Sequence, residues 1–417
     1  MIMPPAAQGC WPLLSLNFFM ADMQAGIGPF LGVFLLAHGW KTGWIGAAMT
    51  VGGVAGMIMT TPAGALVDAI SHKRLMIIAT GICTVVGSGA ILLSQSFWVV
   101  TASQVATAVA GAAIGPAVAG MTLGIVRQAA FNRQIGWNQA FNHAGNMVGA
   151  GLSGLLGWQF GFTAVFWLAV LFGVLSMASV AMIAADEIDN DAARGLHRDA
   201  RGQRNVSGFG VLLGCEPLLI LAGALALFHL GNAAMLPLYG MAMMVAGQGD
   251  PAELVAITIV VAQGTMIVAA LAAMRFAERK GHWWVLLISF VALPIRGLVA
   301  AYTVSKWGVY PVQILDGVGA GLQSVAVPGL VAAILDGTGR INVGQGAVMT
   351  MQGAGASFSP IVGGWIAQSL GYHASFLALA AVALAPVILW LAFARTLRPV
   401  CAAQPAFEAA PVATGAE

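Results

Sequence analysis

The chain divides into about twelve apolar segments of about 20 residues or more, and this pattern limits its fold more than any other feature. Hydrophobic residues make up 59% of the 417 residues and charged residues only 8%, against about 25% charged residues in soluble domains. In hydrocarbon, only helices and closed barrels satisfy every backbone hydrogen bond, and barrel strands need only about 10 residues. We therefore predict an all-α membrane protein. The expected helices cover residues 12–36, 43–67, 75–94, 98–126, 136–157, 162–185, 213–245, 253–274, 284–304, 308–335, 343–369 and 374–395.

The basic residues are distributed unevenly between the two sides of this predicted membrane. Of the 17 Lys and Arg residues, 14 fall in the even-numbered connections and the two tails. Lys41 and Lys306 lie on the other side, and Arg296 lies inside an apolar helix. Because cytoplasmic loops are enriched in Lys and Arg, both termini are expected in the cytoplasm. We expect a multi-pass protein of a bacterial inner membrane, whose basic residues set topology and do not indicate nucleic-acid binding.

The two halves of the chain repeat each other at an offset of 210 residues. The loop 68–72 matches 278–282 at this offset, and Gln104 matches Gln313 at 209. These matches indicate duplication of a six-helix unit. We predict an N-terminal six-helix bundle over 1–185, a solvated cytoplasmic linker over 186–212, a C-terminal six-helix bundle over 213–395 and a disordered cytoplasmic tail over 396–417. The other matches at offset 210 pair Gly145, Gly154, Gly161 and Phe166 with Gly355, Gly364, Gly371 and Phe376.

The connection after the second helix carries a motif of glycine, leucine, aspartate and basic residues. It reads Gly64-Ala-Leu66-Val-Asp68-Ala-Ile-Ser71-His72-Lys73-Arg74. Gly64 allows two helix ends to approach, and a neighbouring helix N-terminus or a cation can stabilise the Asp68 carboxylate. With twelve helices in two halves, the motif resembles the signature of the major facilitator superfamily (MFS), although Ala69 and Ser71 replace the usual Arg and Gly.

The resemblance implies a gate at this connection. In the family, the aspartate latches the two halves together on the cytoplasmic side, so Asp68 is expected to do so here. Arg127, at the end of the fourth helix, is its expected cationic partner. Lys73 and Arg74 either belong to this gate or only fix the topology.

Five ionisable residues fall inside the expected helices, where a charge is costly, and each is therefore a functional candidate. Asp22 lies deep in the first helix, between Asn17 and Gln24, and is expected to be a proton or substrate site; the alternative is a structural hydrogen bond to a neighbouring helix. Arg296 and Asp316 lie at similar depth on adjacent helices and are expected to pair, either statically or as a pair opened by a proton or an anionic substrate.

The remaining two ionisable residues are histidines, which titrate near physiological pH and suit proton exchange. His143 lies among Asn142 and Asn146 on the fifth helix, and His229 lies three residues before Asn232 on the seventh. We expect no metal site at either. In the resembling family, helices one, four, seven and ten line a central cavity, with five and eleven beside them. The resulting candidate cavity set is Asn17, Asp22, Gln24, Gln104, Asn142, His143, Asn146, His229, Asn232, Arg296, Gln313 and Asp316.

The resemblance implies secondary active transport by alternating access. Spaced glycines in the fifth helix are typical of family antiporters, although Ala150 replaces their proline, so we predict proton-coupled export of a small organic molecule such as a drug, a metabolite or a siderophore. The alternatives are a proton-coupled importer of a small nutrient or organic anion and, more remotely, a membrane scaffold. No enzymatic motif is present. The expected partners are a small-molecule substrate, protons and the lipid bilayer; we expect no cofactor and a monomeric protein.

Overall fold

The computed structural model describes residues 10–25, 31, 34, 35, 38–40, 42–196, 208, 210–247 and 251–402. Every regular element in this part is helical. The N-terminal half contains α2 (Trp11–Ala25), α4 (Thr42–Ala69), α5 (Lys73–Leu93), α6 (Phe97–Phe160), α7 (Phe162–Ala181) and the 3-10 turn η1 (Ala192–Arg194). The C-terminal half contains α8 (Gly210–Gly214), α9 (Glu216–Asn232), α10 (Met235–Val245), α11 (Pro251–Lys280), α12 (His282–Tyr302), α13 (Val309–Ile334), α14 (Ile341–Leu370), α15 (Tyr372–Val382), α16 (Leu384–Ala392) and α17 (Ala394–Val400).

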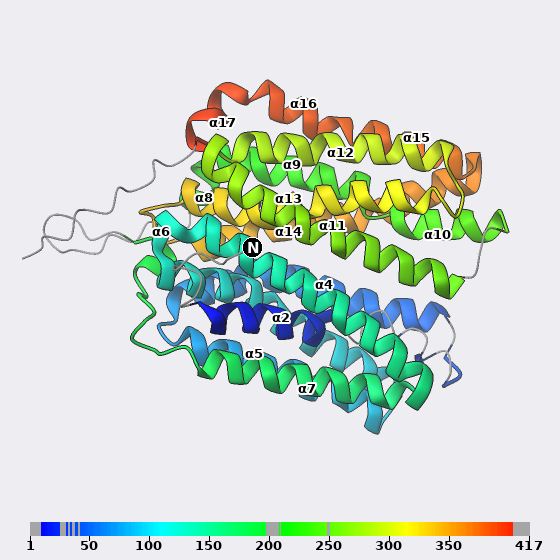
Figure 1. Ribbon diagram of the computed structural model, residues 1–417, viewed down its shortest axis with the longest axis horizontal. Coiled ribbons are helices and arrows are strands. Elements are labelled where there is room, and N and C mark those ends of the chain that lie inside the picture. Colours follow the sequence, from blue (N-terminus) through cyan, green and yellow to red (C-terminus); the bar gives the residue numbers. More distant parts are fainter. Residues whose placement is uncertain are drawn as a thin grey trace, which may run out of the picture.

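Most of these helices are suited to a membrane. Within the described ranges, nine helical stretches are long and apolar enough to cross one. One of them, Phe97–Gly157, contains two crossings, because the chain reverses inside α6. The nine described stretches therefore provide ten crossings. With α2 and the 30-residue α14, the described part of the chain contains the twelve predicted helices. The all-α membrane fold is therefore confirmed, and Figure 1 shows the helices of the two halves lying side by side.

The reversal in α6 is sharper than the sequence suggests. We expected a connection over 127–135, but only Arg127 leaves the helical conformation, with φ 56° and ψ 175°. Residues 128–135 contain neither Gly nor Pro and continue the helix. The segments of α6 before and after Arg127 then lie against each other, as a hydrogen bond of 2.9 Å from Asn138 Nδ2 to Thr122 Oγ1 shows.

The repeat at offset 210 recurs in the helix packing. Gly145 lies against the backbone of Phe18, and a Cβ atom there would come within 1.9 Å of the Phe18 oxygen. Gly355 lies against Ala226 in the same way, with a corresponding distance of 2.0 Å. In each half, therefore, a glycine of the fifth helix allows close contact with the first helix of that half.

We expect Gly145→Ala and Gly355→Ala each to destabilise the protein by about 1–3 kcal/mol, because the added methyl group forces two backbones apart. Thermal unfolding in detergent, followed by tryptophan fluorescence, measures this change. Gly154→Ala and Gly364→Ala are matched controls, since no atom lies within 4 Å of a Cβ placed at either position. Equal midpoints for the four variants would contradict the proposed packing.

The linker and the tail are more ordered than the sequence suggests. Residues 186–196 of the predicted solvated linker pack against the bundle, with Ile188, Ala193 and Leu196 buried. In the predicted disordered tail, α17 docks through Leu397 and Cys401, which are one helical turn apart and fully buried. Burial raises the pKa of the Cys401 thiol to about 12. In both segments, apolar residues placed between the charges provide a surface that packs. Residues 197–207 and 403–417 lie outside the described part.

Candidate functional site

A central cavity of about 390 Å³ lies between the two halves. Its walls come from α2, from both segments of α6, and from α9, α13 and α14. These elements correspond to the first, fourth, fifth, seventh, tenth and eleventh predicted helices. The lining residues are Asn17, Met20, Gly115, Pro116, Val118, Ala119, Ile135, Gln139, Asn142, Phe228, His229, Asn232, Ala320, Gln323, Ser324, Val327, Pro328, Gln345, Met349 and Gln352.

The cavity wall follows the internal repeat. Three of its residues on the fifth helix have counterparts on the eleventh helix, each displaced by 210 positions, and all six line the cavity. Equivalent faces of the two halves therefore enclose the cavity. The three pairs are Ile135 with Gln345, Gln139 with Met349, and Asn142 with Gln352.

Amide side chains supply most of the polar groups of the cavity. Asn142 Nδ2 donates to the backbone oxygen of Asn17 at 3.2 Å, and Asn146 Nδ2 donates to Asn142 Oδ1 at 3.3 Å. In the other half, Gln345 Nε2 donates to the Pro328 oxygen at 2.9 Å, and Gln323 Nε2 donates to a serine hydroxyl. These bonds fix the wall and leave further amide groups for a ligand.

An ion pair lies directly behind this wall. As the sequence predicts, Arg296 and Asp316 pair, with 2.8 Å between Nη1 and Oδ1. Arg296 Nη1 also donates to Asn232 Oδ1, and Asn232 lines the cavity. His229 lines the cavity as well and interacts electrostatically with Asp316. The guanidinium is 1% exposed, and Asp316 is 15% exposed. The pair therefore connects to the cavity through Asn232 and His229.

His143 connects the two halves and does not line the cavity. Its Nδ1 lies 3.0 Å from Gln263 Oε1 on α11, and its Nε2 lies 3.5 Å from Ser324 Oγ on α13. The sequence grouped His143 with Asn142 and Asn146, but the histidine contacts the other half of the protein. Adjacent helical positions point in different directions, which explains this separation.

Other predicted cavity residues lie elsewhere. Gln104 packs against Gly52, at the contact between α4 and α6, and does not line the cavity. Gln313 is fully buried, and within the part of the chain that the structure describes neither of its side-chain polar atoms has a hydrogen-bond partner. Asp22 and Gln24 belong to α2, but their side chains lie outside the described part of the structure.

Sequence reasoning missed four glutamines of the cavity, which are Gln139, Gln323, Gln345 and Gln352. A signal for one of them was available, because Gln352 is the counterpart of Asn142 at offset 210.

The motif after the second helix closes one end of the space between the halves. Asp68 Oδ1 accepts hydrogen bonds from the backbone N–H of Asn342 at 3.3 Å and from Asn342 Nδ2 at 2.7 Å. Asp68 Oδ2 accepts one from the N–H of Val343 at 2.9 Å. Both backbone donors belong to the first turn of α14, where unpaired N–H groups favour a carboxylate. Gly64 lies against the Asn342 backbone, so the two halves touch here.

In the described structure, the partners of Arg127 and of the two cations of the motif lie in the N-terminal half or in the linker. Arg127 pairs with Asp189 of the linker at 3.0 Å, and its side chain is 71% exposed. Our expectation that Arg127 pairs with Asp68 is therefore wrong, because the helix N-terminus satisfies the Asp68 carboxylate. Lys73 Nζ donates to the Ile70 oxygen, and Arg74 Nη2 donates to the backbone oxygen of Ala181, each at 3.0 Å.

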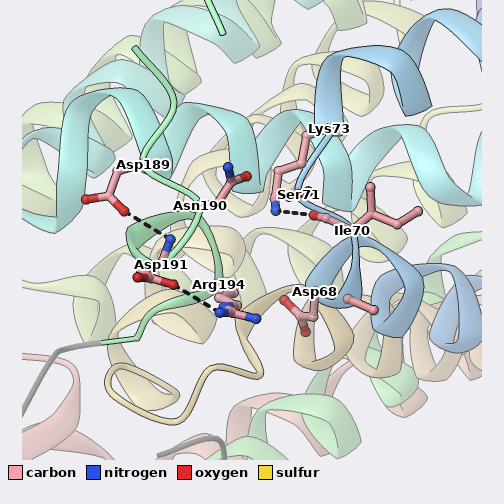
Figure 2. A pocket seen from close by; sticks show the side chains of 9 residues that line it. Asp68, Ile70, Ser71, Lys73, Asp189, Asn190, Asp191 and Arg194 are labelled. Atoms are coloured by element: carbon pink, nitrogen blue, oxygen red, sulfur yellow. Dashed lines mark hydrogen bonds and ion pairs between the residues drawn. The ribbon is translucent and has the colours of Figure 1, made fainter. Parts of the chain in front are cut away.

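The first part of the linker, residues 186–196, packs next to the motif at residues 64–74. Asp189, Asn190, Asp191 and Arg194 line a pocket of about 400 Å³ together with Asp68 and Lys73 of the motif. Figure 2 shows the Asp189 carboxylate turned toward the backbone of the linker itself. Asn342 of α14 contacts both the motif and the linker, since its Nδ2 donates to Asp68 and also to the backbone oxygen of Ala193 at 2.9 Å. The first part of the linker is thus bonded to the same asparagine that contacts Asp68.

Further contacts close the same end of the bundle. Thr61 and Thr350 hydroxyls lie 2.9 Å apart between α4 and α14. His282 Nε2 lies 3.0 Å from Asn132 Oδ1, between the start of α12 and the second segment of α6. Together with the Asp68 contacts, these bonds join the two halves.

The sequence of the chain matches the family model of the Major Facilitator Superfamily over residues 13–342. The chain belongs to this superfamily. It is similar to MFS-type transporters named as uncharacterized from two strains of Mycobacterium tuberculosis, each with 37% identity over 378 residues, which cover 90% of this chain and 90% of the relative. The chain is accordingly a secondary transporter embedded in a membrane through many helices, and it is not an enzyme.

Solved structures share the MFS fold. The human organic anion transporter MFSD10 (TETRAN) superposes with a TM-score of 0.72 and 15% identity, covering 93% of this chain and 100% of its own. The MFS transporter FucP in its outward conformation superposes with a TM-score of 0.69 and 13% identity, covering 91% of this chain and 97% of its own.

Proposed function

We propose that this protein is a proton-coupled exporter of a small organic molecule. The observation that carries the proposal is a polar cavity enclosed by equivalent faces of two repeated halves and closed by the Asp68 contacts at one end. Alternating access requires such a site, with the two halves moving around it. The one-sided basic residues support placing the Asp68 gate and both termini in the cytoplasm of a bacterium.

Proton coupling requires a group whose protonation favours one of the two conformations. Asp22 of α2 is the first candidate, because the sequence places a carboxyl deep in a cavity-lining helix. Asp316 is the second candidate. Its protonation removes the partner of Arg296 and changes the contacts of Asn232 and His229 at the cavity wall.

Export is the direction that the fifth helix supports. Its glycines at 145, 149 and 154 follow the spacing of family antiporters. We propose that the protein acts as a monomer in the inner membrane.

A second candidate function is import of an organic anion. The observation that favours it is that Arg296 Nε and Nη2 are buried and have no hydrogen-bond partner among the described residues. Opening of the pair with Asp316 would offer a guanidinium to a carboxylate substrate.

Proton movement in proteoliposomes tests the proposed coupling. We expect solute-dependent proton flux in the wild type and a loss of at least about tenfold in Asp22→Asn, because an amide carries no proton at that position. Asp186→Asn is the matched control, since Asp186 is exposed outside the predicted helices. The sign of the flux distinguishes export from import. Solute transport that moves no protons in the wild type would overturn the proposal.

A further inference from the structure

The central cavity contains no formal charge from Asp, Glu, Lys or Arg among the side chains described in its wall. Among the described side chains that line the cavity, His229 is the one that can titrate. The closest ion pair, Arg296 with Asp316, lies behind the wall and is neutral as a unit. A charged ligand would lose its hydration in this cavity and would find no Asp, Glu, Lys or Arg charge among the described lining side chains to compensate it, which costs several kcal/mol.

The cavity wall instead offers hydrogen bonds of both kinds from both halves. In the described structure, the amides of Gln139 on α6 and Gln352 on α14 line the cavity without a hydrogen-bond partner. Gln323 and Gln345 each use their Nε2 group elsewhere, which leaves their oxygens as acceptors. A primary amide presents donors and an acceptor, so it is complementary to hydroxyl and amide groups, which also do both.

The wall is mixed in character, because apolar residues and glycine make up 11 of its 20 lining residues. Met20, Phe228 and Met349 contribute apolar surface next to these amides. The volume of about 390 Å³ is near the lower end of the range of about 300–1,000 Å³ for small-molecule sites. The cavity therefore fits a compact molecule with polar groups on its edges and some C–H surface.

We propose that the substrate is a compact uncharged molecule carrying several hydroxyl or amide groups, held between the Gln139 side of one half and the Gln352 side of the other. This inference rests on the proposed function, since it takes the central cavity as the transport site. Of the two candidate functions, it favours export of an uncharged molecule over import of an organic anion. Because neither glutamine belongs to the ion pair, the proposal makes predictions that are independent of proton coupling.

Direct binding tests this proposal without any proton gradient. The full chain is purified in detergent and its thermal midpoint is measured with three sets of probes. The uncharged set is glucose, mannitol, myo-inositol and a tripeptide amide with blocked termini; the anionic set is benzoate, lactate and citrate; the cationic set is choline and tetraphenylphosphonium. A ligand that binds the folded state raises the midpoint. We expect stabilisation by one or more members of the uncharged set and none by the charged sets.

Variants locate the binding. We expect Gln139→Leu and Gln352→Leu each to weaken the affinity for the stabilising probe by about 3- to 10-fold, as expected for the loss of one hydrogen bond. Gln104→Leu is the matched control, because it removes an amide from the same half outside the cavity. Stabilisation by a charged probe that Gln139→Leu or Gln352→Leu abolishes would overturn the proposal, and so would a lack of response to the whole uncharged set.

The two proposals can fail separately. If an uncharged probe binds through Gln139 and Gln352 but moves no protons in proteoliposomes, the inferred substrate class stands and proton coupling is wrong. If proton-coupled flux is found only with charged solutes, proton coupling stands and the inferred substrate class is wrong.

Discussion

Replacement of Asp316 by Ala is expected to destabilise the protein by about 3–5 kcal/mol, because it leaves the Arg296 guanidinium buried without its counter-charge. The thermal midpoint in detergent should fall by about 10 °C. Transport should also be lost, since Asn232 holds the same guanidinium at the cavity wall.

A double variant separates the two effects. In Arg296→Met/Asp316→Leu, both charges are replaced by apolar groups of similar size, and most of the stability should return. Proton-coupled transport should not return if the pair has a functional role. A double variant that transports like the wild type would show that the pair is only structural, while a stable Asp316→Ala single variant would contradict the buried ion pair itself.

The gate gives the second large effect. Asp68→Ala removes the acceptor of three hydrogen bonds from Asn342 and Val343 and leaves these donors buried at the start of α14. Asn342 Nδ2 keeps its hydrogen bond to the Ala193 oxygen, so the loss falls on the backbone donors of Asn342 and Val343. At about 1–3 kcal/mol for each of these two groups, the closed state should lose about 2–6 kcal/mol relative to the open state. We expect hydrogen exchange at the first turn of α14 to accelerate, and transport to fall by more than about tenfold.

Arg127→Gln is the informative control for this prediction. Arg127 is exposed and pairs with Asp189, so its replacement should change exchange at α14 and transport by less than about twofold. Asn342→Ala, in contrast, should reproduce part of the Asp68→Ala effect, because Asn342 contacts both Asp68 and Ala193. A strong effect of Arg127→Gln with a weak effect of Asn342→Ala would restore the gate expected from the motif and contradict the observed contacts.

The sequence predicted several residues of the candidate site, but it did not predict all of their contacts. The pairing of Arg296 with Asp316 followed from their equal depth on adjacent helices, since a buried charge requires a partner. Asn17, Asn142, His229 and Asn232 were also placed at the cavity from helix order. The direction of His143 did not follow from the sequence, because its contact to Gln263 joins helices from different halves.

The sequence by itself determined the fold class, the helix order and the repeat, because apolar length, one-sided basic residues and the offset of 210 are properties of the linear chain. Only the tertiary structure decided which groups meet. Asp68 was recognised as a gate residue from its motif, yet its partners are the first backbone donors of α14, 274 and 275 residues away. The linker was assigned to solvent from its polar residues and the tail from its Ala- and Pro-rich composition, while Ala193 packs against α6 and Leu397 packs in the core of the C-terminal half, on surfaces that form only on folding. Hydrophobic periodicity shows which segments form helices, but it does not show which residues of the two halves meet, such as Asp68 with Val343 or His143 with Gln263.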